Sequence, residues 1–547
     1  MSKKIIQIND ISGGWQPTFF QSAKNQCSQT LGIDPEAVST GIGSKISIPT
    51  GGIKFNGYSK FSDSNVNSHP IAIITNPKDE KIYSVLSNGR LISYNSSLAS
   101  ETLIGTVTGS SASGAFYYNN YIYILGTGAS QDDVSRYGPL NNSPSLTNGV
   151  WKGSTLGTQT ALTDTTYPTT RNSVKYLNHF GMVHVDNKAY FCDFKDGKGI
   201  IHFIRTTKVT DEGDTNDGST YDAIDLPIGW YPYSIESYGN DIVIAASQNS
   251  SSSVKQGKSA LFFWDTTSPS FYRIVSLSDP LCTALKYSNG ILYCLSGSAD
   301  GGTRLSRYLG GDSVEGIYLV PDSHPPLQCG VEEYGNRIVF AGFTARQYWI
   351  TWHSGIFAYG SSNENLSQGL HMIGLSNGLT TTSSNGVITV VKNVQPSVND
   401  VKFVFGGTDG TNYSLEKEDS SASQDTFFIS RLFTIGKAFS IKRITLRLPA
   451  GISSSSYSVT PSLIIDNGRT TSSGTLINTT NFDGLSSGSS LKHVSSFVTL
   501  TEKDFNNGLN TSGANNFALE LKCNNASFPA IQLPIEIELE VSDNDYE

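Results

Sequence analysis

Apolar and aromatic residues recur along the chain in short runs that are broken by two-residue polar turns. One such segment reads FYYNNYIYIL at 116–125, and others read IESYGNDIVIA from Ile235, LKYSNGILYCL from Leu285 and VEEYGNRIVFA from Val331. Each predicts a β-hairpin, because Asn-Asn, Gly-Asn and Asn-Gly pairs tolerate the positive φ values of tight hairpin turns. The pattern therefore predicts an all-β protein.

These hairpins form a repeat with a spacing of about 50 residues, which is typical of β-propeller blades. Further strand candidates, such as RLISYN and ALFFWD, bring a copy to the four strands of a blade. The turns are expected near Asp79, Asn120, Asn187, Asn240, Gly290, Asn336 and Gly386. The longer interval before Asn187 is attributed to an inserted loop at 137–168. We predict a β-propeller of about seven blades over residues 53–420; the alternative is a sandwich with irregularly spaced hairpins.

The pattern changes on both sides of this repeat. From residue 421 to 547, about eight strand candidates are joined by Ser, Gly and Asn turns, which predicts a C-terminal β-sandwich of the jelly-roll or immunoglobulin-like type. Its last strand, 535–541, alternates aliphatic residues with three glutamates, as expected for one buried and one wet face. Residues 1–52 contain little that could form a compact unit, and they predict an extended N-terminal arm that lies on a neighbouring subunit.

Composition agrees with short strands and many turns, since only 16% of the residues are charged and 53 are glycine. The formal net charge is −9 and no basic arm occurs, so we expect no sequence-specific binding of nucleic acid. The start, MSKKIIQINDISGGW, lacks the apolar region of a signal peptide. No apolar run is long enough to span a bilayer, so we expect no membrane insertion.

The sequence contains no G-x-S-x-G, H-E-x-x-H or P-loop motif, and we expect no enzyme and no cofactor. The six cysteines are widely spaced and predict buried free thiols rather than a zinc site. The segment from Asp211 to Asp222 gathers carboxylates and leaves two interpretations, a solvated loop or a calcium site. The solvated loop is favoured because the EF-hand spacing fails, so no metal site is assigned.

Two groups of aromatic residues are candidates for contacts. Trp15, Phe19 and Phe20 in the predicted arm are candidate interface residues. Trp349 and Trp352 lie in RQYWITWHSGIFAYG, where aromatic faces could stack on sugar rings or fill a blade core.

The opening INDISGGWQP…NQC…LGIDPE resembles the start of structural proteins of tailed bacteriophages, and FTIGKAFSIKRITLRLPAG, SLIIDNG, NFALEL and LPIEIELEV resemble their C-terminal sandwich. The resemblance implies a virion component, made in the host cytoplasm, that assembles as a homo-oligomer with tail, neck or portal-vertex proteins. It carries no catalytic residues. Two alternatives stay open: a receptor- or glycan-binding protein at the virion periphery, with a host surface glycan as partner, and a glycan hydrolase on a propeller scaffold.

Overall fold

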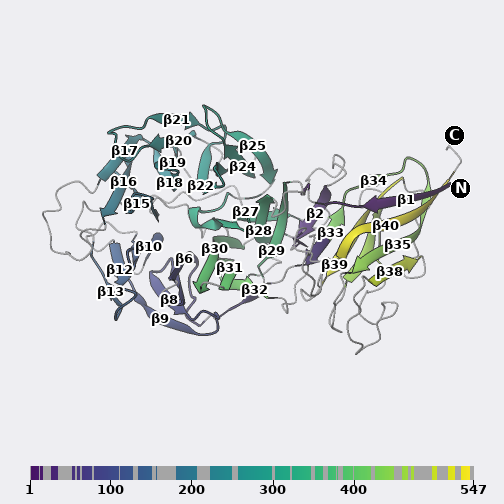
Figure 1. Ribbon diagram of the computed structural model, residues 1–547, viewed down its shortest axis with the longest axis horizontal. Helices are drawn as coiled ribbons and strands as arrows, with labels where there is room; N and C mark the ends of the chain where they lie inside the picture. The colour runs from purple at the N-terminus through teal and green to yellow at the C-terminus, as the bar shows by residue number, and fades with distance from the viewer. Residues whose placement is uncertain are drawn as a thin grey trace, which may run out of the picture.

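In the computed structural model, the described residues form nine antiparallel sheets that are arranged in two bodies (Figure 1). It contains no α-helix among the residues that it describes, which are 2–11, 13–15, 26–31, 33–34, 52–55, 58–61, 64–76, 79–109, 111–126, 134–150, 156, 180–205, 222–248, 257–297, 302–320, 323, 325–345, 352–360, 368–376, 379, 386–397, 400–419, 426–448, 459–465, 470–473, 496–501, 515–523 and 531–542. The prediction of an all-β protein is confirmed.

The larger body is a propeller of seven four-stranded blades, which confirms the predicted fold and blade count. Blade 1 comprises β6 (Pro70–Asn76), β7 (Lys81–Leu86), β8 (Arg90–Tyr94) and β9 (Glu101–Thr106). Blade 2 comprises β10 (Gly114–Tyr118), β11 (Tyr121–Leu125), β12 (Val134–Gly138) and β13 (Ser145–Thr147). Blade 3 comprises β14 (Gly181–Val183), β15 (Lys188–Lys195), β16 (Lys198–Arg205) and β17 (Asp222–Ile228). Blades 4 and 5 comprise β18 (Tyr231–Tyr238), β19 (Asp241–Ser247), β20 (Ser259–Trp264), β21 (Arg273–Ser276); and β22 (Leu281–Ser288), β23 (Ile291–Gly297), β24 (Thr303–Tyr308), β25 (Glu315–Val320). Blade 6, which follows the single-turn 3-10 helix η4 (Gln328–Gly330), comprises β26 (Val331–Tyr334), β27 (Arg337–Ala345), β28 (Trp352–Gly360) and β29 (Gly369–Leu375).

Blade 7 closes the ring with strands from two distant parts of the chain. Its inner strands are β30 (Val387–Ser397), β31 (Asp400–Thr408) and β32 (Tyr413–Glu418), and its outermost strand is β5 (Tyr58–Lys60). The Tyr58 ring packs against Phe405 at a centroid distance of 5.0 Å and is almost completely buried. The start of the propeller is thus hydrogen-bonded to its end.

Six of the seven predicted hairpin turns connect the two innermost strands of blades 1 to 6. Asn120, Asn187 and Asn336 there have φ values of 67°, 60° and 61°, as the turn chemistry predicted. The seventh prediction, at Gly386, is wrong because Gly386 precedes β30, and the turn of blade 7 lies between Ser397 and Asp400. The Ser-Asn-Gly sequence resembles a turn, but the apolar residues after it form the innermost strand itself.

The smaller body is a sandwich of two sheets, each with six strands among the residues described above. The first contains β1 (Ser2–Ile8), β3 (Ile33–Asp34), β4 (Gly52–Phe55), β35 (Phe439–Leu448), β38 (Ser496–Thr501) and β40 (Ile531–Val541). The second contains β2 (Cys27–Leu31), β33 (Thr426–Ser430), β34 (Phe433–Thr434), β36 (Val459–Ile465), β37 (Thr470–Ser473) and β39 (Asn516–Cys523).

The prediction of an extended N-terminal arm over residues 1–52 is wrong. Strand β1 pairs along its length with β40, with Ser2 opposite Val541 and Ile8 opposite Ile535, and β2 pairs with β33. Ile8, Ile11 and Cys27 belong to the buried core of the sandwich. The propeller is therefore inserted between the N-terminal and C-terminal parts of one sandwich, and both termini lie at its far end (Figure 1).

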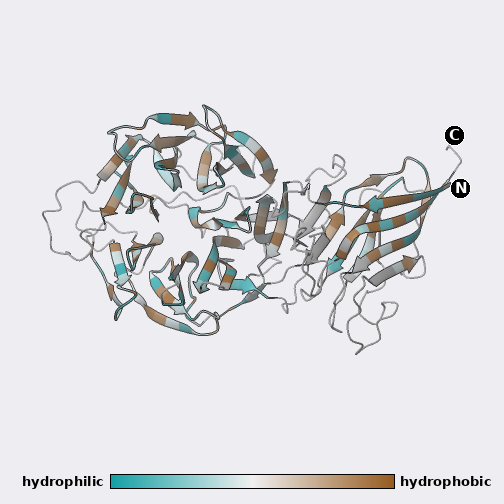
Figure 2. Ribbon diagram, in the orientation of Figure 1, coloured by the Kyte–Doolittle hydropathy of each residue, from teal (hydrophilic) through white to brown (hydrophobic). Residues whose placement is uncertain are grey.

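The predicted alternation of the last strand is confirmed. Ile535, Ile537 and Leu539 on β40 are fully buried, whereas the intervening glutamates are partly exposed. Figure 2 shows the same alternation of brown and teal along the sandwich strands. Strand β40 lies at the centre of its sheet, between β35 on one side and β1 with β4 on the other. Its aliphatic face supplies much of the sandwich core.

The two bodies are joined by a close contact between Gly14 and blade 6. The Trp15 N–H donates to the Leu370 carbonyl at 2.7 Å, and a Cβ added to Gly14 would lie 2.5 Å from the Leu370 nitrogen. Gly14 also has a φ of +88°, a value that residues with a Cβ adopt only with strain. Only glycine satisfies both conditions at this position.

We expect Gly14→Ala to destabilise the protein by about 2–3 kcal/mol, because it adds a backbone clash to the conformational strain. Gly290→Ala is the matched control, because Gly290 has a φ of +81° but open space around its Cβ position. The control is expected to cost about 1 kcal/mol. Urea-induced unfolding of both variants measures the difference, and equal losses would show that the contact with blade 6 is not tight.

Candidate functional site

The structure places Trp15 inside the molecule, which corrects its assignment as a contact to a neighbouring subunit. Its side chain is 7% exposed and stacks on Phe357 of blade 6, with ring centroids 6.0 Å apart. The same buried cluster contains Phe427 and Ile429 of the sandwich. Trp15 is thus an interface residue between the two bodies of one chain.

The other predicted contact residues are not tested in this way. Phe19, Phe20 and Trp349 lie outside the described residues, as does the acidic segment from residue 211 to 221. Trp352 begins β28, where it lies opposite Ala345. The prediction of a glycan contact at Trp349 and Trp352 therefore stays a prediction.

The structure brings a different set of residues together, in the central channel of the propeller. A turn from the connection between β25 and β26 enters this channel and divides it. Thr283 of blade 5 donates to the Pro326 carbonyl at 2.6 Å, Ser234 of blade 4 donates to the Gln328 side chain, and the Gln328 amide donates to the Ile235 carbonyl at 3.3 Å. Gln328 and Cys329 line a cavity on each side of this turn, so the turn acts as a plug.

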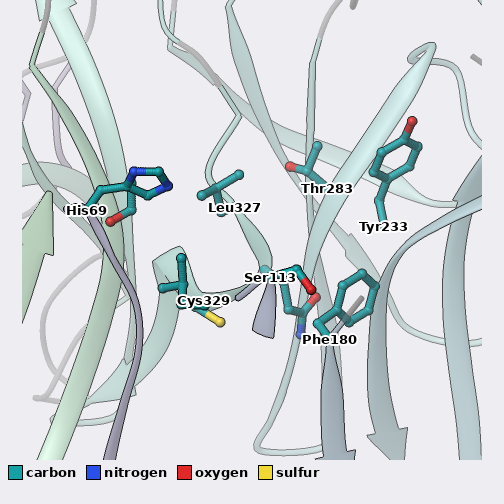
Figure 3. A pocket seen from close by; sticks show the side chains of 10 residues that line it. His69, Ser113, Phe180, Tyr233, Thr283, Leu327 and Cys329 are labelled. Atoms are coloured by element: carbon teal, nitrogen blue, oxygen red, sulfur yellow. The ribbon is translucent and has the colours of Figure 1, made fainter. Parts of the chain in front are cut away.

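On one side of the plug is a narrow cavity of about 40 Å³ (Figure 3). Its walls come from the beginnings of the innermost strands and from the residues before them. Besides Gln328 and Cys329 of the plug, the lining residues are His69, Ile71, Ser113, Phe180, Tyr233, Thr283, Leu327 and Thr389. Burial lowers the pKa of His69 to about 4, and its Nδ1 atom lies 3.1 Å from the Ser87 hydroxyl. The imidazole is therefore neutral near pH 7.

On the other side is a wide cavity of about 330 Å³. Residues of all seven innermost strands line it. The strands of blades 1 to 3 contribute Thr75, Tyr117, Met182 and Val183, whereas those of blades 4 to 7 contribute one charged residue each: Glu236, Lys286, Glu332 and Lys392. One wall of the wide cavity is thus neutral and the opposite wall is charged.

We call these four charged residues the channel tetrad. Ion pairs join three of them, and the fourth, Glu236, interacts electrostatically with all three. The Lys286 ammonium lies 2.7 Å from one carboxylate oxygen of Glu332, and the Lys392 ammonium contacts the other oxygen. The Glu332 side chain is 9% exposed, whereas that of Lys392 is 39% exposed. The tetrad therefore extends from the interior of the channel to solvent.

The two carboxyl groups of the tetrad have opposite electrostatic environments. Burial raises the pKa of Glu236 to about 7, because the attraction of Lys286 and Lys392 does not offset its desolvation and the repulsion by Glu332. Burial acts in the same direction on Glu332, but the two adjacent ammonium groups outweigh it and lower the pKa of Glu332 to about 2. Near pH 7, Glu332 is ionised, whereas Glu236 is ionised in about half of the molecules and protonated in the others.

These pKa values predict opposite effects of two matched substitutions. Glu236 has a folded-state pKa above its ordinary value of 4.5, so its ionisation destabilises the protein as the pH rises from 4.5 through about 7. We expect Glu236→Gln to stabilise the protein by about 1–2 kcal/mol near pH 8 and to have little effect near pH 4.

Glu332 has a folded-state pKa below its ordinary value, so it stabilises the protein above pH 4.5, and this contribution disappears as the pH falls to about 2. Glu332→Gln is therefore expected to destabilise the protein by about 2–3 kcal/mol near pH 7. Urea-induced unfolding of both variants across this pH range tests the pair. The same sign of effect for both variants near pH 8 would contradict these environments.

The sequence contained a signal for the tetrad that the motif search missed. In IESYGN, LKYSNG and VEEYGN, the second residue of each repeated hairpin is charged, and these residues are Glu236, Lys286 and Glu332. Side chains at equivalent positions of consecutive innermost strands face the same channel. Comparing residues across repeats, rather than searching for catalytic motifs, would have found them.

Other candidate groups add little to this site. Cys27, Cys192, Cys282 and Cys294 are buried free thiols, as predicted, whereas the free thiol of Cys329 belongs to a residue that is only partly buried. Within the described ranges, no three His, Cys, Asp or Glu side chains are grouped so that they could hold a metal ion. The part of the chain that the structure describes has no helix that is long and apolar enough to cross a membrane.

No family model and no curated protein matches the sequence. Among solved structures, the Neurospora crassa Pan2 WD40 domain is similar at 11% identity and a TM-score of 0.37, over 66% of this chain and 95% of that chain. The structure described as YCF48 bound to D1 peptide is similar at 8% identity and a TM-score of 0.40, over 66% of this chain and 94% of that chain. These values are too low to carry a statement about function, and the propeller assignment rests on the strand pairing described above.

Proposed function

We propose that this chain is a structural component of the virion of a tailed bacteriophage, in its tail or neck, and that its sandwich contacts neighbouring subunits. The observation that carries the proposal is the pairing of the two ends of the chain. The opening motifs that resemble such proteins include the end of β1, both ends of β2 and all of β3, and the closing motifs include β35 and most of β36, β39 and β40. The two groups of motifs are far apart in the sequence, but they belong to the same folded domain.

The arrangement of the two bodies also supports a structural role. The propeller and the sandwich share the buried cluster around Trp15, so the propeller is held in a fixed position at one end of the sandwich. At the other end, β1 pairs only with β40 among the described strands, and Ile5 on β1 is 56% exposed. An outer strand with a free edge and an exposed aliphatic residue is suited to pairing with a second copy.

The mass of the purified chain in solution tests this proposal. We expect a closed homo-oligomer by light scattering after size exclusion, with a ring visible by electron microscopy. Ile5→Asp is expected to give a folded monomer. Ile274→Asp is the matched control, because Ile274 is 53% exposed on β21 of the propeller, and this variant should assemble normally. A wild-type chain that stays monomeric at about 100 μM would contradict assembly through the sandwich.

A second candidate function, ligand binding at the virion periphery, is favoured by one observation. The wide cavity combines a charged wall with a neutral wall, and cavities of this composition are common binding sites. The charges of the channel tetrad indicate which class of ligand this cavity would bind.

A further inference from the structure

We propose that the wide cavity binds a small polyhydroxylated carboxylate of monosaccharide size, with its carboxylate at Lys286 and Lys392. This inference does not depend on a role in the virion, because it rests only on the channel of the propeller. It assigns a binding site to a part of the molecule that the sequence motifs did not indicate.

The two lysines supply the charge for such a ligand. An ammonium group has three donors, and Glu332 accepts from each of the two lysines with a different oxygen. Further donors on both lysines are left for a ligand in the cavity that they line. Because both side chains are partly exposed, at 22% and 39%, an anion can reach them without breaking the fold.

The rest of the tetrad and its neighbours match the hydroxyl groups of the ligand. Glu236 and Glu332 provide oxygen acceptors, while Thr75 and Gln328 line the same cavity and can donate or accept. On the opposite wall, Met182 and Tyr117 provide surface for the C–H face of a sugar ring. A ligand with one carboxylate, several hydroxyls and a compact ring would use both walls.

The plug determines how such a ligand enters. Gln328 and Cys329 close the wide cavity toward the narrow one, so the channel is a cup rather than a passage through the propeller. Glu236, Lys286 and Glu332 lie close to the hairpin-turn ends of β18, β22 and β26, whereas Lys392 lies in the middle of β30. A single ring, free or at the end of a glycan, fits this geometry, whereas a polymer threaded through the channel does not.

The charge of the cup also predicts a dependence on pH. Glu236 faces Lys286 of β22, Glu332 of β26 and Lys392 of β30, and the adjacent lining residues of β14, Met182 and Val183, are neutral. When Glu236 ionises as the pH rises through about 7, it adds a negative charge beside the ligand carboxylate and competes for Lys286. Affinity for a carboxylate should therefore fall severalfold between about pH 6 and about pH 8.

Isothermal titration calorimetry with D-glucuronate and D-glucose tests the proposal, because the two probes differ at the carboxylate. At about pH 6 we expect glucuronate to bind with a Kd below about 1 mM and glucose to bind at least about tenfold more weakly. Lys392→Met should weaken glucuronate binding at least about tenfold, whereas Lys258→Met, which removes an exposed lysine outside the channel, should leave it unchanged. Equal affinity for the two sugars, no heat at about 20 mM glucuronate, or an unchanged Kd in Lys392→Met would overturn the proposal.

A second variant provides a test that remains valid if Lys392→Met does not fold. Glu236→Gln is expected to bind glucuronate with the same affinity at about pH 6 and pH 8, because the titrating group is gone. A wild-type affinity that does not change with pH would count against the site. The methyl glycoside of glucuronate then distinguishes the two sources of the ligand: it binds if the cup takes the terminal residue of a glycan and fails to bind if the cup takes the free acid.

Discussion

A chain that lacks residues 1–52 is expected to lose its sandwich while its propeller stays folded. The deletion removes strands β1, β2 and β3 and, with them, the buried side chains of Ile8, Ile11, Trp15 and Cys27. Each large buried side chain contributes about 2–4 kcal/mol, so the total loss is comparable with the 5–15 kcal/mol that stabilise a typical domain. Limited proteolysis should yield a protected fragment close to residues 53–420, because β5 still closes the ring.

A rearranged chain provides the control for this deletion. Ser2 lies opposite Val541 in the antiparallel pair of β1 and β40, so the two termini are neighbours. A chain that begins at residue 56 and carries residues 1–55 after residue 547, joined by a short Gly-Ser linker, retains every strand. It should unfold like the wild type. A protected sandwich in the deletion variant, or an unfolded sandwich in the rearranged chain, would show that β1 to β3 are not part of this core.

The propeller could be predicted from the sequence because its information is local. Each inner hairpin brings together residues that are close in the chain, and Asn-Asn, Asn-Gly or Gly-Asn pairs specify the turns of blades 2, 4, 5 and 6. The blades repeat these hairpins, so one unclear copy is supported by its neighbours. The one misplaced turn, at Gly386, lies in blade 7, where the hairpin copy was least regular and where β5 comes from the other end of the propeller.

The contribution of N-terminal strands to the sandwich could not be predicted in the same way. Strand β1 pairs with β40, which lies more than 500 residues away in the sequence, and no local pattern encodes a partner at that distance. Within β1, SKKIIQI, Ile8 is the one buried residue, so this strand has no continuous apolar face of the kind that identifies a core strand.

The candidate site occupies an intermediate position. Glu236, Lys286 and Glu332 stand on strands that were predicted, whereas Lys392 lies on β30, where the hairpin was misplaced. The burial and the charge pairing depend on how the seven blades close around the channel. The plug is the least predictable part, because 325–330 has no repeat counterpart and its position is fixed by bonds to Thr283 and Ser234 on other blades. Closure of the ring converts scattered charges into one site.

Trp15→Ala is expected to destabilise the protein by about 3–5 kcal/mol and to separate the unfolding of the two bodies. Trp15 is the N-terminal contribution to a cluster that contains Phe357 and Leu370 of blade 6 and Phe427 and Ile429 of the sandwich. Its removal leaves a cavity between the bodies rather than inside either one. Differential scanning calorimetry should therefore show two transitions where the wild type shows one, with the sandwich unfolding first.

Two further substitutions separate this coupling from the general cost of losing a tryptophan. Trp230→Ala removes a partly buried indole that packs on Phe262 within the propeller, at a centroid distance of 5.0 Å, so it should lower stability without splitting the transition. Trp15→Phe keeps an aromatic ring against Phe357 and should restore a single transition. If Trp15→Ala unfolds in one step and loses no more stability than Trp230→Ala, the two bodies are coupled elsewhere, through the strand connections at 55–58 and 418–426 rather than through this cluster.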